Sequence, residues 1–178
     1  HIHAFPDGRA YPCCFSLDKY PVGDLNKDSM ETVFNGTDMK QMRLNMLANK
    51  PSKQCNKCYD QEKSGFFSLR LSSNKHFGHN VGMVENTQAD GSADFVIKYW
   101  DIRFSNLCNL ACRSCGTWFS SNWYEDHKKL TGKPPEHAKI MRVGRSSNDI
   151  WEQMLEQFEH VEQFYFAGGE PLIMEEHY

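Results

Sequence analysis

Cysteine constrains this chain more than any other residue type. Seven cysteines fall into three tight groups: Cys13-Cys14, Cys55-x-x-Cys58, and Cys108, Cys112 and Cys115. Adjacent cysteines and C-x-x-C pairs suit metal coordination better than disulfide geometry, and an odd count leaves one thiol outside a full set of disulfides. We find no secretion signal, so we expect a cytoplasmic, reducing setting in which these cysteines bind metal or carry out redox chemistry.

Composition excludes several classes of function. The net charge of −3 gives no basic field for binding nucleic acid, so no nucleic-acid partner is expected. No apolar run approaches the roughly 20 residues that a membrane-spanning helix needs, so no membrane partner is expected either. Aromatic residues at 13% favour a packed core, and 178 residues can hold one domain plus part of another.

The first 77 residues predict a small α+β unit. A turn at 6–8, with Pro and Gly in the positions that favour it, predicts a hairpin between strands near 1–5 and 9–11. His1 and His3 alternate on the first strand, which favours an exposed strand face. Ser29 is placed to cap a short helix, and residues 56–64 predict another helix, which carries Cys58.

The pattern changes after residues 78–94, which are polar, without a period, and typical of a linker. Apolar residues then alternate through 100–104, which predicts a strand. Helices are expected near 117–130 and after Ser147 or Asn148, a second strand at 161–166, and a further helix from 172. This strand–helix–strand–helix order predicts a parallel sheet with right-handed crossovers.

The cysteine triad directly follows the first of these strands. Cys108, Cys112 and Cys115 place three thiolates in an eight-residue loop, which suits a [4Fe–4S] cluster with one iron open for catalysis. The loop also lies where α/β folds place their sites, at the carboxyl end of a strand. A structural zinc site that uses Cys112 and Cys115 is the alternative.

The second signal is the turn after the next strand, Gly168-Gly169-Glu170-Pro171. Its two glycines allow a ligand to approach the backbone, and its carbonyls and Glu170 can bind an ammonium group. In isolation such a sequence is typical of an ordinary strand-to-helix turn. Its position one crossover after the triad makes the functional interpretation stronger.

Together the triad and the turn resemble the radical S-adenosylmethionine (radical SAM) superfamily, over residues 98–175. The resemblance implies that Cys108, Cys112 and Cys115 hold a [4Fe–4S] cluster and that Gly168–Pro171 contact S-adenosylmethionine. It implies reductive cleavage of that cofactor to a 5′-deoxyadenosyl radical, which abstracts hydrogen from a substrate, with an electron donor such as flavodoxin or ferredoxin. It assigns no catalytic residue beyond the cluster.

The N-terminal part resembles the SPASM/Twitch module, which holds an auxiliary iron–sulfur cluster. The resemblance covers residues 1–77, rests on Cys13-Cys14, the segment 23–35 and Cys55-x-x-Cys58, and implies cluster ligands among these four cysteines. Asp28 stands where full SPASM modules carry a further cysteine, which favours the shorter, Twitch-like form. A structural zinc site is again the alternative.

These resemblances imply an α/β fold in three parts: an auxiliary module at 1–77, a linker at 78–94, and at 95–178 the first two βα units of a partial (β/α)6 barrel resembling a TIM barrel. Since about 30 residues make one βα unit, we expect a fragment of a longer enzyme. The substrate is expected to be a peptide, a protein or a small molecule. The alternative functions are a non-catalytic zinc-binding interaction module and a dithiol oxidoreductase that uses Cys55 and Cys58.

Overall fold

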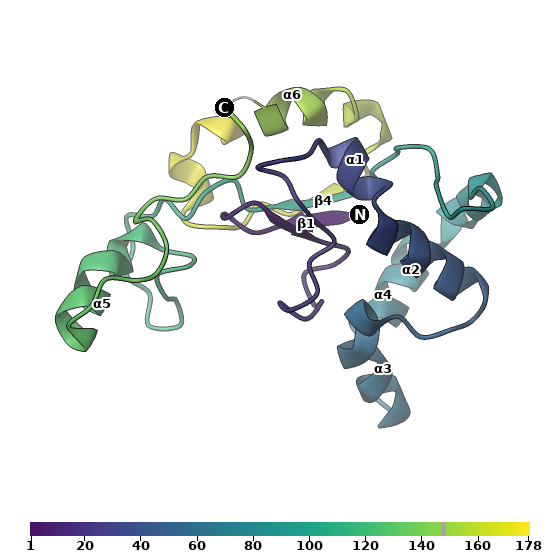
Figure 1. Cartoon of the computed structure of the whole chain (residues 1–178), viewed down its shortest axis with the longest axis horizontal. Helices are drawn as coiled ribbons and strands as arrows, with labels where there is room; N and C mark the ends of the chain where they lie inside the picture. The colour runs from purple at the N-terminus through teal and green to yellow at the C-terminus, as the bar shows by residue number, and fades with distance from the viewer. Residues whose placement is uncertain (147–148) are drawn as a thin grey trace.

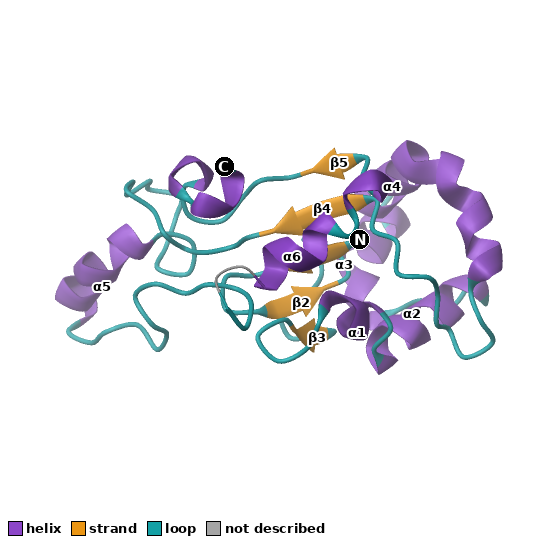
Figure 2. Ribbon diagram, turned by 90° about the horizontal axis from the view of Figure 1, so that it is seen from above, coloured by secondary structure: helices purple, strands orange, loops and turns teal. Residues whose placement is uncertain are grey.

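An open five-stranded sheet forms the centre of the fold (Figures 1 and 2). The computed structural model describes residues 1–146 and 149–178, so the helix cap expected at Ser147 or Asn148 lies outside the described residues. The sheet order is β3-β2-β1-β4-β5, with β1 parallel to β4 and β4 parallel to β5. The strands are β1 (Ile2–Ala4), β2 (Arg9–Tyr11), β3 (Gly23–Asp24), β4 (Tyr99–Ile102) and β5 (Gln163–Phe164).

The architecture is therefore mixed α/β, as expected, and the sheet is not closed. The predicted hairpin is confirmed: β1 and β2 are antiparallel, and Gly8 in the turn has a φ of 91°. Parallel pairing of β4 with β5 confirms the predicted sheet type in the C-terminal part. The partial barrel and the boundaries 1–77, 78–94 and 95–178 stay predictions.

One sheet contains strands from both ends of the sequence. β1, from the N-terminal part, pairs in parallel with β4, with His3 beside Asp101 and Ala4 beside Ile102. The sequence predicts these strands in separate units, 1–77 and 95–178. No local sequence signal predicts the pairing of strands so far apart in the chain. The alternation of apolar and polar residues in a strand indicates which face is buried, and it does not indicate which strand lies beside it.

Six α-helices and several short 3₁₀ segments surround the sheet in the described residues. α1 begins after Ser29, whose hydroxyl accepts a hydrogen bond from the Thr32 amide at 3.1 Å, as the sequence predicted. No helix in the described part of the chain is long and apolar enough to cross a membrane. The helices are α1 (Met30–Phe34), α2 (Thr37–Leu47), α3 (Asn56–Lys63), α4 (Leu69–Phe77), α5 (Tyr124–Thr131) and α6 (Asp149–Leu155).

The two faces of the sheet differ in chemistry. Alternate residues of β1 and β4, among them Ile2, Trp100 and Ile102, are buried in one core with side chains from α1 and α6, which lie on the same side of the sheet in Figure 1. His3 and Asp101 belong to the opposite set of strand positions, so the second face is polar. The two segments that carry the predicted site, the cysteine loop and the Gly-Gly-Glu turn, follow β4 and β5 in the chain.

Three predicted elements are shorter than expected. The helix predicted for 117–130 is a 3₁₀ turn at Ser121–Trp123 followed by α5, and the strand predicted for 161–166 is paired only at Gln163–Phe164. The helix expected from residue 172 is a pair of 3₁₀ turns, Pro171–Ile173 and Glu175–His177. The predicted linker contains its own 3₁₀ segment, Gly78–Asn86.

Candidate functional site

The cysteine loop and the Gly-Gly-Glu turn lie side by side at the carboxyl ends of β4 and β5. The Gly169 amide donates to the Ser105 carbonyl at 2.9 Å, and the Glu170 amide donates to the Leu107 carbonyl at 2.8 Å. A Cβ on Gly169 would overlap the Leu107 carbonyl, so only glycine fits there. The sequence expectation that these two motifs share one end of the sheet is therefore met.

The cysteine loop is held by the residues that follow it. The Ser121 hydroxyl accepts from the Cys108 amide at 3.1 Å, and the Trp123 indole N–H donates to the Cys112 carbonyl at 3.1 Å. These contacts fix the backbone of the loop, and none of its three thiols is in a disulfide. Cys112 is exposed, whereas Cys108 and Cys115 are half-buried.

Glu170 has a local structural role in the turn. Its carboxylate accepts from the Leu172 amide at 3.1 Å and so caps the 3₁₀ turn that starts at Pro171. Gly168 adopts a φ of 109°, a conformation that favours glycine. Both observations agree with the ordinary strand-to-helix turn considered above, and neither conflicts with a ligand beside it.

The N-terminal cysteines form a second group, around a cavity of about 160 Å³. Cys13, Cys55 and Cys58 all line it, and so does Arg70. Cys58 is buried in the first turn of α3, while Cys55 ends the 3₁₀ turn before this helix. Burial, and then the neighbouring Cys58, raise the pKa of the Cys55 thiol, whereas Arg70 acts in the opposite direction.

Cys14 does not line this cavity, although it is adjacent to Cys13 in sequence. A hydrogen bond with Cys13, burial, and the charges of Cys13 and Asp101 raise the pKa of the Cys14 thiol. Asp101 lies on the polar face of the sheet, in β4. The structure thus distinguishes the two adjacent cysteines: Cys13 lines the cavity with Cys55 and Cys58, and Cys14 does not.

Both cysteine groups fit soft-metal chemistry in their donor type, because every donor is a thiol. Within residues 1–146 and 149–178, no set of three or more His, Cys, Asp or Glu side chains is close enough to hold a metal ion as it stands. Metal binding by thiols also requires their deprotonation, so it is coupled to pH and to folding. The assignment of individual ligands therefore remains a prediction.

Sequence reasoning missed the polar face of the sheet. His3 Nδ1 lies 2.9 Å from Asp101 Oδ2, and both side chains are almost fully buried. The expectation of an exposed strand face at His3 is wrong, because β1 lies between β2 and β4 in the middle of the sheet. Two charged residues, Asp101 in β4 and Arg103 directly after it, alternate with apolar residues in the sequence, and this was the available signal.

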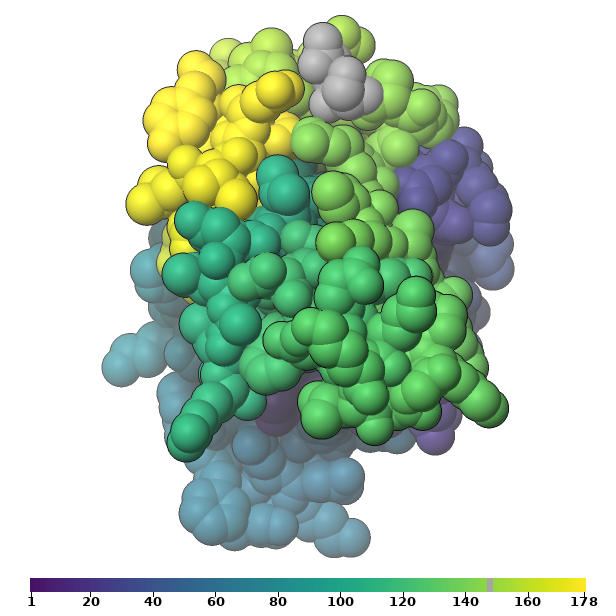
Figure 3. Space-filling model, turned by 90° about the vertical axis from the view of Figure 1, so that its left-hand side faces the viewer, coloured from purple at the N-terminus to yellow at the C-terminus, as the bar shows by residue number. Residues whose placement is uncertain are grey.

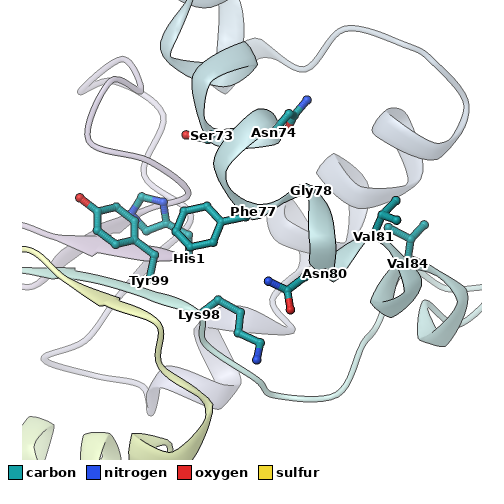
Figure 4. A pocket seen from close by; sticks show the side chains of 10 residues that line it. All are labelled: His1, Ser73, Asn74, Phe77, Gly78, Asn80, Val81, Val84, Lys98 and Tyr99. Atoms are coloured by element: carbon teal, nitrogen blue, oxygen red, sulfur yellow. The ribbon is translucent and has the colours of Figure 1, made fainter.

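A larger cavity, of about 630 Å³, lies at the opposite end of β1 and β4 (Figure 4). His1, Phe77 and Tyr99 form its aromatic wall, with the His1 and Tyr99 rings 4.5 Å apart. His1, together with Ser73 and Asn74, also lines the smaller cavity that holds Cys13, Cys55 and Cys58. The two cavities are therefore neighbours, and both are at the far end of the sheet from Cys108.

Comparison with known proteins identifies one part of the chain. Residues 1–59 match the family model SPASM, an iron–sulfur cluster-binding domain. No curated protein and no solved structure matches the chain. The matched residues include Cys13, Cys14, Cys55 and Cys58. The match supports the SPASM module inferred for the N-terminal part and the binding of an iron–sulfur cluster there, and such domains are typical of radical SAM proteins.

Proposed function

We propose that this chain is part of a radical SAM enzyme with an N-terminal auxiliary cluster. Cys108, Cys112 and Cys115 hold a [4Fe–4S] cluster, and Gly168–Pro171 hold S-adenosylmethionine beside it. When reduced by a flavodoxin or ferredoxin, this pair supplies a 5′-deoxyadenosyl radical that takes hydrogen from a peptide, protein or small-molecule substrate. The chain supplies binding, orientation and exclusion of water.

The backbone contact between the two motifs carries this proposal. Gly169 packs against the carbonyl of Leu107, the residue directly before Cys108. A ligand held by the turn therefore lies next to a ligand held by the loop, which is the arrangement that an open iron with a chelating cofactor needs. A zinc-binding interaction module would need this contact only for packing and not for holding a ligand beside the cysteine loop.

The auxiliary cluster is assigned to Cys13, Cys55 and Cys58, which share one cavity. Cys14 lies outside this ligand set because it does not line the cavity. A [4Fe–4S] cluster has four irons, and each cysteine thiolate binds one of them. Three cysteines therefore leave one iron that either takes a further ligand or stays open.

Iron and sulfide counts test both assignments. After anaerobic reconstitution, the wild-type protein should bind about eight irons, and Cys112→Ala and Cys58→Ala should each lose about four. Cys14→Ala is the matched control, since it removes a thiol next to the cavity and should keep the full count. The reduced wild-type protein should also convert S-adenosylmethionine to 5′-deoxyadenosine, as measured by chromatography.

Two results would contradict the proposal. Stoichiometric zinc without sulfide would establish a zinc-binding module instead. An iron count that is the same in Cys112→Ala as in the wild type would remove the C-terminal cluster, while the N-terminal cluster could still be measured through Cys58→Ala.

A further inference from the structure

We propose that Arg103 binds an oxyanion of the substrate, a carboxylate or a phosphate, beside the Gly-Gly-Glu turn. This inference rests on the proposed function for the identity of the neighbouring cofactor, but the anion site itself can be tested without that cofactor. Arg103 directly follows β4, one residue beyond its last paired position, and is half-buried.

The guanidinium of Arg103 has no hydrogen-bonding or ion-pair partner within residues 1–146 and 149–178. A guanidinium carries five N–H donors and cannot lose its charge, so Arg103 keeps these donors available to an acceptor from outside the chain. The other half-buried arginines all have acceptors: Arg9 pairs with Asp7, Arg43 donates to the carbonyls of Phe34 and Gly91, Arg70 pairs with Glu62, and Arg142 pairs with Glu176.

Two aromatic rings hold the Arg103 side chain. Its guanidinium carbon lies 5.5 Å from the centre of the Phe5 ring and 5.0 Å from the centre of the Phe119 ring. The two rings are themselves 5.6 Å apart. Stacking on rings uses the flat faces of a guanidinium and leaves its N–H edge available, and this edge binds carboxylate or phosphate in a bidentate manner.

The position of Arg103 relates this cation to the proposed reaction. A Cβ on Gly168 would lie 3.1 Å from the Arg103 Cβ, so the side chain starts directly beside the Gly-Gly-Glu turn. Phe119, which stacks on Arg103, follows the cysteine loop by four residues. In Figure 3 a recess below the cysteine loop opens onto N-terminal residues, drawn in purple.

No carboxylate within residues 1–146 and 149–178 forms an ion pair with the Arg103 guanidinium. Asp101 is the closest acidic residue along β4, and its carboxylate lies against His3 at 2.9 Å. Arg9 also stacks on Phe5, but Asp7 balances its charge. Arg103 is therefore the uncompensated cation of this aromatic cluster, and an anionic group on the substrate completes it.

Arginine-selective NMR tests this site in the whole chain. The protein is labelled with ¹⁵N-arginine and titrated with inorganic phosphate in one series and with glutarate in another. We expect the Arg103 side-chain signal to move and to saturate in at least one series. By calorimetric titration with the same anions, Arg103→Gln should bind at least about tenfold more weakly than the wild type, because it lacks the charged hydrogen bonds, and Arg103→Lys should have an intermediate effect.

Arg9→Gln is the matched control, since Arg9 stacks on the same ring but is paired with Asp7. Its phosphate and glutarate affinities should stay within twofold of the wild type. Thermal melts of all variants separate loss of binding from loss of folding. An Arg103 signal that neither anion moves would overturn the proposal.

S-adenosylmethionine binding by the reconstituted protein separates substrate from cofactor. We expect Arg103→Gln to keep the cofactor affinity within twofold. A tenfold loss would assign Arg103 to the cofactor carboxylate and overturn the substrate assignment. If the wild type binds no S-adenosylmethionine, the proposed function fails, while the anion titrations still decide whether Arg103 is an oxyanion site.

Discussion

At the scale of single residues, Gly169 is the position with the least freedom. Its backbone lies against the carbonyl of Leu107, and the Gly169 amide donates to Ser105. Any side chain at this position would separate the turn from the cysteine loop. The glycine is thus required by the packing of two backbones, whatever ligand the turn holds.

We expect Gly169→Ala to lower the free energy of unfolding by about 1–3 kcal/mol, the usual cost of overpacking. Gly116→Ala is the matched control, because Gly116 belongs to the same loop region and a Cβ there would meet nothing within 4 Å. Urea denaturation of both variants measures the difference. Equal stabilities would show that the turn does not pack against Leu107 in solution.

The second prediction for single residues concerns the stability that the buried pair of His3 and Asp101 contributes. Asp101→Leu should cost about 3–5 kcal/mol of unfolding free energy, because it leaves a buried polar partner alone. The double variant His3→Leu with Asp101→Leu should recover most of that loss, since both polar groups are then gone. A double-mutant cycle by denaturation measures this coupling, and strictly additive effects would contradict it.

At the scale of elements, the corner between α3 and α4 positions Cys58 and Arg70 at the N-terminal cavity. Glu62 of α3 accepts hydrogen bonds from Ser68, the cap of α4, and from Arg70. The bonds from Arg70 and then Ser68 lower the pKa of the Glu62 carboxyl below its ordinary value. Two helices are therefore joined through one carboxylate.

This carboxylate makes the corner sensitive to acid. Because the folded-state pKa of Glu62 is lowered, its stabilising effect is present above the pKa of the unfolded chain and is lost as pH falls through the folded value. We expect the protection of α4 amides against exchange, relative to the intrinsic exchange rate at each pH, to fall below about pH 4 in the wild type, and to be low at every pH in Glu62→Gln. Glu156→Gln, at an exposed position in the sequence after α6, should behave as the wild type. Wild-type exchange in α4 without such a pH dependence would contradict this role.

Local signals in the sequence predicted local structure well. The turn at Gly8, the cap at Ser29 and the alternation through Trp100 are contained within a few residues, and each is confirmed. The helix expected from residue 172 failed, because an apolar pattern over a few residues does not separate a 3₁₀ turn from an α-helix.

Features that depend on distant partners could not be predicted in the same way. Cysteine spacing predicted three groups of thiols, and the structure brings Cys13 of the first group to Cys55 and Cys58 of the second. The burial of His3 and the stacking of Arg103 depend on β1 pairing with β4, which no local pattern encodes. Tertiary contacts therefore determine the polar part of the site.

At the scale of the whole molecule, one sheet contains strands from both the N-terminal and the C-terminal part of the chain. The N-terminal cavity and the cysteine loop are connected through β1 and β4, which pair in parallel over three residue pairs. The Arg103 amide extends this ladder by donating to the Ala4 carbonyl at 3.1 Å. The two cysteine groups are thus held in one framework, so we expect both parts of the chain to unfold together.

Cleavage of the chain between its parts tests this continuity. Gly82 lies in the exposed segment between α4 and β4, and a Cβ there would meet nothing within 4 Å, so a protease site inserted at this position should leave the fold intact. After cleavage, we expect the two pieces to elute together in gel filtration without denaturant. In the background of His3→Pro they should separate, because proline in this central strand removes a ladder hydrogen bond and disrupts pairing with β4. Wild-type pieces that separate under native conditions would show that β1 and β4 belong to independent units.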